Sequence, residues 1–313
     1  AIEAFHILAY GQGLADPHLP RLSRDPRTRV GAPQPAPLPP VPVRPTPASR
    51  SEFVPESLSA SRHQHLIDCP YQFFAADCLR LSPQEEVREA LEKADYGELV
   101  HTCLQAFHQK VGKLPGPFAG PLDPDRRAEA IDLLTQISQA VFRQHLEDNF
   151  EHRGWLHRWL AHVPGYVDWQ LKRATAWQVE DCERRANRPV GGFELTGRLD
   201  RIDAGEDGVA VVDYKTGAVP SRGEVETGEA VQLPSYALLL DHVARVEYLQ
   251  VEAARNLALE GEALETLSAA VESRLKRMRE QLEDGAALPA WGDADTCARC
   301  DFRGVCRRPA WGD

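Results

Sequence analysis

Residues 197–217, GRLDRIDAGEDGVAVVDYKTG, place charged side chains in two strands that otherwise belong to a core. The first half alternates apolar and polar residues, and 208–214 is a continuous Val-rich run typical of a buried strand. The polar sequence AGEDG between them predicts a turn. A charge beside a buried sheet must be paired, solvated or bound to a metal ion, because a bare charge there is costly. The fold must therefore supply partners for Asp200, Asp213 and Lys215.

The rest of the chain predicts helices first, then a meander of strands, then strand–helix units. Helices are expected at 59–81 (broken near Pro70), 83–111, 124–149, 152–172, 229–242 and 262–284. Strands are expected at 174–186, 193–203, 208–214 and 246–254. This order predicts an α/β fold with a mixed central sheet flanked by helices.

A proline-rich stretch divides the chain of 313 residues. Residues 31–48 hold eight prolines in eighteen positions, which favours a stiff, extended linker. We expect 1–30 to be the remnant of a preceding domain, 31–50 to be the linker, and 51–313 to be the folded domain.

The net charge of −11 argues against salt-driven binding of nucleic acid by the whole surface. Cations still cluster locally, in RLKRMR (274–279) and RGVCRR (303–308), and each run fits either a solvated face or a basic groove. No apolar run is long enough to cross a bilayer, and the first residues do not resemble a signal peptide. We therefore expect a cytoplasmic protein with no membrane partner.

The two carboxylates of the hairpin can lie close together at the edge of the sheet. Lys215, two residues after Asp213, projects to the same side because side chains alternate along a strand. Two neighbouring carboxylates repel unless a cation lies between them, and a hard divalent ion suits oxygen ligands. The alternative is a surface ion pair between Asp213 and Lys215, and the hairpin alone leaves both interpretations open.

Two further motifs can contribute to the same edge. The sequence GELVH places His101 four residues after Gly97, which allows close approach of the backbone. The sequence QLPSYALLL places Gln232 and Tyr236 one helical turn apart on a single face. A single helical histidine is more often a core or surface residue, so neither motif is decisive by itself.

The ordered set of these motifs, with GRLDRID and VVDYKTG between them, resembles the RecB-like branch of the PD-(D/E)XK nuclease superfamily over residues 57–309. The resemblance implies a restriction-endonuclease-like core. It implies Mg²⁺ or Mn²⁺ bound by His101, Asp200 and Asp213. It also implies that Lys215 serves the attacking water, and that Gln232 and Tyr236 support the site and the DNA.

The C-terminal sequence CARCDFRGVC is a tight cysteine cluster, Cys297-x2-Cys300-x5-Cys306, in a chain without secretory features. Such a cluster predicts a metal site, with Cys69 of DCPYQFF as a candidate fourth ligand. The arrangement resembles the iron–sulfur staple of AddB-type nuclease domains and of some CRISPR-adaptation nucleases, in which a [4Fe–4S] cluster joins the two ends of the domain. Four thiolates also fit Zn²⁺. The remaining cysteines are expected to be small buried residues: Cys78, Cys103 and Cys182.

The resemblance implies a Mg²⁺- or Mn²⁺-dependent deoxyribonuclease, exonucleolytic on single-stranded ends, in double-strand-break repair. It would be the nuclease domain of a helicase–nuclease complex with an ATP-driven partner, since this chain lacks a GxxxxGK[ST] phosphate loop. One alternative is a catalytically inactive iron–sulfur DNA-binding module, and another is a stand-alone nuclease of CRISPR adaptation. The expected DNA contacts are Arg198, Arg201, Arg274, Lys276 and Arg277.

Overall fold

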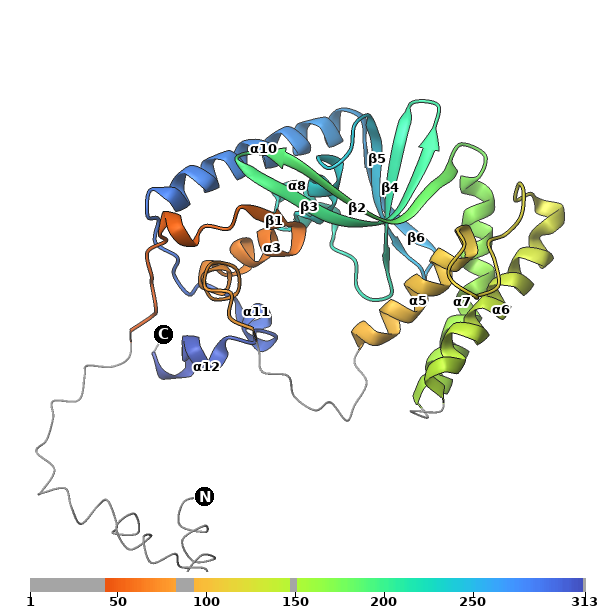
Figure 1. Cartoon of the computed structure of the whole chain (residues 1–313), viewed down its shortest axis with the longest axis horizontal. Helices are drawn as coiled ribbons and strands as arrows, with labels where there is room; N and C mark the ends of the chain where they lie inside the picture. Colours follow the sequence, from red (N-terminus) through yellow and green to blue (C-terminus); the bar gives the residue numbers. More distant parts are fainter. Residues whose placement is uncertain (1–42, 83–92, 147–150, 312–313) are drawn as a thin grey trace, which may run out of the picture. The chain divides into compact units, whose positions relative to one another are not determined.

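A six-stranded mixed sheet organises the protein (Figure 1). The structure is a computed structural model that describes residues 43–82, 93–146 and 151–311. The strand order is β1-β3-β4-β5-β6, with β2 also paired to β3. Pairs β1/β3 and β4/β5 are parallel, and the other pairs are antiparallel. The strands are β1 (Ser57–Ser59), β2 (Gln178–Val190), β3 (Phe193–Gly205), β4 (Gly208–Lys215), β5 (Val243–Gln250) and β6 (Arg255–Glu260). The predicted mixed α/β sheet is confirmed.

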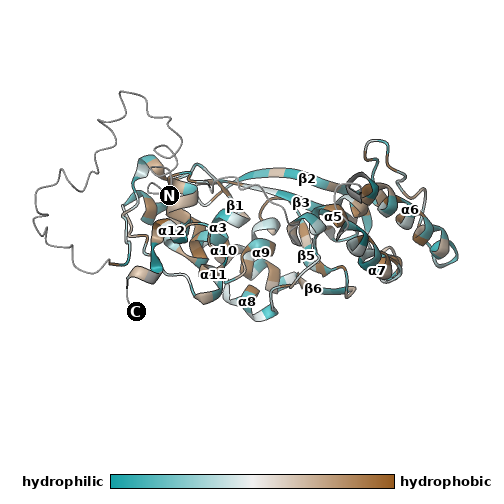
Figure 2. Ribbon diagram, turned by 90° about the horizontal axis from the view of Figure 1, so that it is seen from below, coloured by the Kyte–Doolittle hydropathy of each residue, from teal (hydrophilic) through white to brown (hydrophobic). Residues whose placement is uncertain are grey.

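A two-residue glycine loop sets the register of the long β2–β3 hairpin. Gly191 and Gly192 both have positive φ (57° and 84°), as a type I′ turn requires, and the pair Val190↔Phe193 closes the loop. From this point the two strands pair residue by residue as far as Asp181↔Ile202. Figure 2 shows β2 coloured largely as hydrophilic, which suits an edge strand.

Helices cover both faces of the sheet and form two apolar clusters. One cluster includes residues of β4, α3 (Ala60–Asp68), α9 (Gln232–Ala237) and α10 (Gly261–Glu283). The other includes residues of β4, α5 (Lys93–His108), α6 (Arg127–Leu146) and α7 (Glu151–Arg173). Val211 belongs to the first cluster and Val212 and Tyr214 to the second, because successive strand residues point to opposite faces. None of the helices within the described ranges is long and apolar enough to cross a membrane.

The helix predicted to break near Pro70 does break there, but the part after the break is a short helix and a π-helical turn instead of one resumed helix. Cys69 lies at the junction between α3 and α4 (Pro70–Phe73), and a π-helical turn, Phe74–Cys78, follows. The short helices of the C-terminal cysteine segment are α11 (Ala294–Ala298) and α12 (Arg303–Cys306).

The sequence prediction differs from the structure at several elements, among them β2, which begins and ends four residues later than expected. The helix expected at 229–242 is wrong: α8 (Arg222–Thr227) ends at Gly228, whose φ is +77°, and α9 is a separate short helix. Strand β5 begins three residues earlier than expected, and β6 was not predicted because RNLALE is short and half polar. The helix expected from residue 83 is described only from Lys93, and the expected end of the 124–149 helix also lies outside the described residues.

Residues 45–49, which the sequence placed in the linker, pair with residues 286–290. Ser49 N–H donates to Ala286 O (2.8 Å), Leu288 N–H to Pro47 O (2.7 Å) and Ala290 N–H to Pro45 O (3.0 Å). They belong to the same compact unit, Arg44–Arg307. The described residues outside this unit include a short 3-10 helix, Arg308–Ala310.

Candidate metal centre

Strands β3 and β4 stop pairing at the point where the predicted carboxylates lie. The last pair is Arg201↔Val212, so Asp200 and Asp213 are the next residues on each strand. Beyond this pair the N–H of Tyr214 donates to the Asp200 side chain (Oδ2, 2.8 Å) instead of to the β3 backbone. The two strands separate after this pair, and we call this point the fork. Strand β3 continues past the fork and pairs there with β1, so Asp200 lies in the interior of β3 and not at its end.

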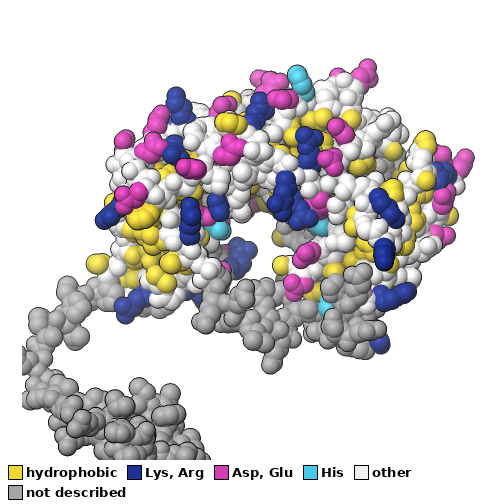
Figure 3. Space-filling view, in the orientation of Figure 1, with side chains coloured by type: hydrophobic (Ala, Val, Ile, Leu, Met, Phe, Trp, Pro, Cys, Tyr) yellow, Lys and Arg dark blue, Asp and Glu magenta, His cyan; other side chains and the backbone are white. Residues whose placement is uncertain are grey.

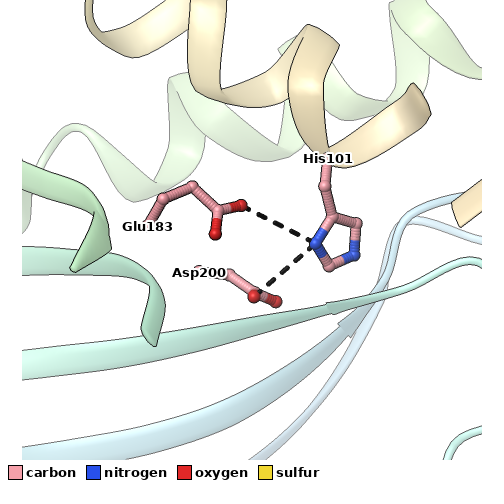
Figure 4. Close-up of side chains that lie close together, drawn as sticks. All are labelled: His101, Glu183 and Asp200. Atoms are coloured by element: carbon pink, nitrogen blue, oxygen red, sulfur yellow. Dashed lines mark ion pairs between the residues drawn. The ribbon is translucent and has the colours of Figure 1, made fainter. Parts of the chain in front are cut away.

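Helix α5 brings His101 to this fork from the face covered by α5–α7 (Figure 4). His101 Nε2 is 3.1 Å from the carbonyl oxygen of Tyr214, and a carbonyl only accepts, so Nε2 carries the proton. Nδ1 then faces Asp200 Oδ1 at 3.5 Å. A Cβ on Gly97 would lie 3.3 Å from the Thr216 side chain, so glycine permits this close approach of α5 to the end of β4. In the neutral ring, the histidine that the motif singled out thus presents the Nδ1 lone pair to the carboxylates.

Glu183 of β2 is a third acidic residue at the site, and the sequence analysis missed it. Its Oε1 is 3.9 Å from His101 Nδ1, and the ligand atoms of His101, Glu183 and Asp200 lie within 4.8 Å of one another. The flanking pairs Cys182↔Arg201 and Arg184↔Leu199 place Glu183 opposite Asp200. Glu183 has φ +56°, an uncommon conformation for a residue with a side chain, of a kind that often marks functional sites.

Asp213 lies beside this group of three and is held by a separate network. Lys215 Nζ is 2.5 Å from Asp213 Oδ2 and donates to Gln232 Oε1 at 2.9 Å. Gln232 Nε2 donates to Asp213 Oδ1 and to the Tyr236 hydroxyl, both at 2.8 Å. Hydrogen bonds and one ion pair therefore link Asp213 and Lys215 of the hairpin to Gln232 and Tyr236 of α9. Gln232 and Tyr236 share one face of the helix, as their spacing predicted.

The local electrostatics favour a cation. Burial, and then the charge of Asp200, raise the pKa of Asp213 to about 7, against the opposing effect of Lys215. Burial and Asp200 also raise the pKa of Glu183. For His101, burial alone would lower the pKa, but the hydrogen bond and charge of Asp200, with the charges of Asp213 and Glu183, raise it. The charge of Asp200 thus opposes the ionisation of both neighbouring carboxylates, and a cation between them would relieve this repulsion.

One comparison with known proteins, a family profile, covers every residue of this site. The sequence profile described as the PD-(D/E)XK nuclease superfamily matches residues 57–307. The chain belongs to this superfamily. Every group at the fork lies inside the matched range, from His101 of α5 to Tyr236 of α9.

Individual relatives of this nuclease-superfamily chain are distant. An uncharacterized protein of Rickettsia bellii is 22% identical over 198 residues, which cover 62% of this chain and 22% of the relative. An uncharacterized protein of Rickettsia conorii is 25% identical over 211 residues, 61% of this chain and 22% of the relative. The chain thus spans about a fifth of the length of these relatives. Among solved structures, the crystal structure of SSO0001 is 16% identical, with a TM-score of 0.32, over 82% of this chain and 88% of that one.

A buried polar network lies behind the fork of this PD-(D/E)XK chain and corrects one predicted DNA contact. Arg201 is fully buried and donates to Asp203 (Nε–Oδ1, 2.6 Å), to Gln170 (2.7 Å) and to the hydroxyls of Tyr166 and Tyr214 (3.3 Å each). Its guanidinium cannot contact DNA, because it ties β3 to α7. Since Tyr214 also carries the backbone groups that hold Asp200 and His101, this network supports the candidate metal centre from behind.

The other predicted DNA contacts lie at the surface or near it. Arg198 of β3 is 63% exposed and pairs with Glu183 (Nε–Oε2, 2.6 Å). On α10, Lys276 and Arg277 are exposed, whereas Arg274 is half-buried and donates to the carbonyl of Gly228 (2.8 Å). Contact of these four residues with DNA stays a prediction.

The four cysteines predicted as cluster ligands come from two distant segments that meet in the fold. Trp291 N–H lies 3.4 Å from Cys69 Sγ, and Tyr71 N–H donates to Pro289 O (3.2 Å). Burial first, and then charges on Cys306 and Cys69, raise the pKa of Tyr71. The electrostatic neighbours of Cys300 include Cys69 and Cys297. Among the described residues, no three of these sulfur atoms lie within 4.8 Å of one another.

Proposed function

We propose that this chain is a divalent-metal-dependent nuclease that hydrolyses DNA phosphodiester bonds. The observation that carries the proposal is the convergence of His101, Glu183 and Asp200 beside the Asp213–Lys215 pair. The motif order further supports a place as the nuclease domain of a helicase–nuclease complex that acts on single-stranded ends in double-strand-break repair.

The residues at the fork fit Mg²⁺ or Mn²⁺. Hard divalent ions take oxygen ligands, and Mg²⁺ typically uses only one or two protein carboxylates together with substrate phosphate. Asp200 and Glu183 offer such oxygens, His101 adds the Nδ1 lone pair, and Asp213 lies close enough to feel the charge of Asp200. Burial, and then the charge of Asp200, raise the pKa of Asp213 and of Glu183 although Lys215 and Arg198 lie beside them, and a divalent ion at the fork would favour the ionised form of both carboxylates.

The chain's own residues can perform the remaining tasks of hydrolysis. A bound divalent ion supplies Lewis-acid chemistry, which neutralises charge on the phosphate and activates water. In the reaction the water oxygen bonds to phosphorus, one P–O bond breaks, and the leaving oxygen acquires a proton. Lys215, fixed by Asp213 and Gln232, has a third N–H with which it can orient the water or stabilise charge that develops on the phosphate. Gln232 and Tyr236 keep this ammonium in place.

We further propose that Cys69, Cys297, Cys300 and Cys306 hold a [4Fe–4S] cluster with a structural role. A tetrahedral zinc site has Zn–S bonds of about 2.3 Å, so its sulfur atoms lie roughly 3.8 Å apart. No three of the four sulfur atoms lie within 4.8 Å of one another in the described part of the chain, so they do not form a closed tetrahedral zinc site as they stand, and the choice of an iron–sulfur cluster rests on the spacing of the cysteines in the sequence. A cluster at this position would link residue 69 to residue 306 and close a very long loop.

Cleavage of labelled single-stranded and duplex DNA in Mg²⁺, with EDTA as a blank, tests the function. Asp200→Asn should abolish cleavage, whereas Asp207→Asn, an exposed aspartate in the turn between β3 and β4, should cleave like the native protein. Equal cleavage by the two variants would refute the site. DNA binding without cleavage by any of the three proteins would refute the nuclease and favour an inactive DNA-binding module.

A further inference from the structure

We propose that Arg185 and Arg198 form a phosphate-binding site next to the metal centre, which holds the backbone of the nucleic-acid strand to be cut. The inference rests on the proposed nuclease function and deepens it. It assigns to β2, the edge strand of the sheet, the task of holding the strand independently of its sequence.

The two arginines face each other across the β2–β3 ladder. The register pairs Arg185 directly with Arg198, so both side chains leave the same side of the sheet. Like charges in directly opposed positions destabilise a sheet. Such a pair is expected where the function needs two positive charges together, and the glycine loop that fixes the register keeps them in place.

The pair has more positive charge than the protein neutralises. Arg198 contacts Oε2 of Glu183 (2.6 Å), and its side chain stays 63% exposed. The side chain of Arg185 is exposed and makes neither an ion pair nor a hydrogen bond in the part of the chain that the structure describes. Only one of the two guanidinium groups is thus paired with a carboxylate, and the planar fork of a guanidinium matches phosphate oxygens.

The position relative to the metal centre identifies the ligand. Arg185 and Arg198 are two residues along their strands from Glu183 and Asp200, a separation of about 7 Å. One strand of B-form DNA rises about 3.4 Å along the helix axis per phosphate, and neighbouring phosphates lie farther apart than this rise because the strand winds around the axis. Glu183 links the two sites, because Oε1 faces His101 while Oε2 contacts Arg198. A strand with one phosphodiester at the centre can therefore place a neighbouring phosphate on the arginine pair.

Figure 3 shows Lys and Arg side chains gathered beside a hollow in the face shown, with acidic and histidine side chains close by. A chain with a net charge of −11 needs such a local concentration of positive charge to bind a polyanion.

The test compares Arg185→Ala with Arg184→Ala. Arg184 is the adjacent residue, also exposed, but it pairs with Leu199 and points to the opposite side of the strand. We measure binding of a fluorescent single-stranded oligonucleotide in EDTA over a salt series. Arg185→Ala should weaken binding about 5–10-fold and reduce the slope of log K against log salt by about 1. Arg184→Ala should stay within about twofold of the native protein, and Arg185→Lys should keep the slope.

Equal losses in the two alanine variants, or no loss in either, would overturn the site. In Mg²⁺, the Arg185→Ala variant should raise KM with little change in kcat, since the residue binds the strand away from the reacting phosphate. Because the binding assay needs no metal and no cleavage, it separates this proposal from the nuclease function. A protein that never cleaves but still shows the Arg185 effect would refute the nuclease and retain the phosphate site.

Discussion

The main-chain N–H of Tyr214 donates a 2.8 Å hydrogen bond to the carboxylate of Asp200, one residue beyond the end of the β3–β4 ladder. The Asp200 side chain accepts the hydrogen bond that a backbone carbonyl of β3 would accept if the β3–β4 ladder continued. The carbonyl of the same Tyr214 residue accepts from His101. One strand residue therefore orients a carboxylate and an imidazole that come from elements one hundred residues apart.

We expect Glu183→Gln to weaken divalent-metal binding at least tenfold, because the amide keeps the shape of the side chain and loses its charge. Isothermal titration with Mn²⁺ measures the effect. The control is Glu180→Gln, an exposed glutamate of the same strand, which should bind Mn²⁺ like the native protein. Unchanged affinity in Glu183→Gln would remove Glu183 from the metal centre.

Replacement of Arg201 by Met should lower the free energy of unfolding by about 3 kcal/mol or more. The substitution takes away a fully buried guanidinium and leaves Asp203 with only Arg173 as a cationic partner. Urea denaturation measures the change. Arg277→Met, at an exposed position of α10, should cost less than about 1 kcal/mol. A loss of similar size in both variants would contradict a structural role for the buried network.

Stability should fall as the pH drops from about 6.5 to about 4, in part because of His63. This histidine is fully buried, neither ring nitrogen has a partner among the described residues, and burial, with a smaller effect of Arg274, lowers its pKa to about 4. Between these pH values the unfolded chain binds the proton and the folded one does not, so protonation favours unfolding by up to about 3 kcal/mol.

The measurement for His63 is the unfolding free energy at pH 7 and pH 5. His63→Leu should show a smaller loss between the two pH values than the native protein, and His157→Leu, at an exposed position, should show the native loss. Some pH dependence should survive in His63→Leu, because burial and Arg201 also hold the pKa of His108 well below its ordinary value. An identical pH dependence in both variants would contradict the prediction.

Anaerobically purified protein should be brown and contain iron, and Cys300→Ala should lose both the colour and the iron. By analogy with a covalent cross-link of similar loop length, the unfolding free energy should drop by about 3 kcal/mol or more. Absorbance and metal analysis check the first outcome and denaturation the second. Cys78→Ala, at a buried cysteine outside the proposed ligand set, should keep its iron. Zinc in place of iron in the native protein would contradict the cluster.

The sequence indicated the order of the elements because hydrophobic periodicity is local. It also indicated His101, Asp213 and Lys215, because their motifs, each weak by itself, occur in a specific order along the chain. Glu183 could not be recognised by composition, since it is one of 47 acidic residues. The signal that could have found it is Gly191-Gly192: a two-residue loop pairs 190 with 193, and counting back places Glu183 opposite Asp200.

Arg201 shows the opposite error. A charged residue next to a catalytic motif was interpreted as a surface contact, because Lys and Arg are rarely buried without a partner. Its partners come from α7 and from its own strand, Gln170, Tyr166 and Asp203, and only the tertiary structure brings the first two close. The prediction of a single helix at 229–242 was wrong for a local reason, because the left-handed residue Gly228 ends α8 before α9 begins.

The backbone pairing of residues 45–49 with 286–290 has a mechanical consequence. Tension on the chain upstream of Val43 would reach these three hydrogen bonds before it reached the sheet. From there the load would pass to Trp291, whose N–H lies against Cys69 Sγ, and so into the cysteine-bearing segments. The proposed cluster, and strand β1, which begins at Ser57 and pairs with β3, would be the next parts of the fold to carry the load.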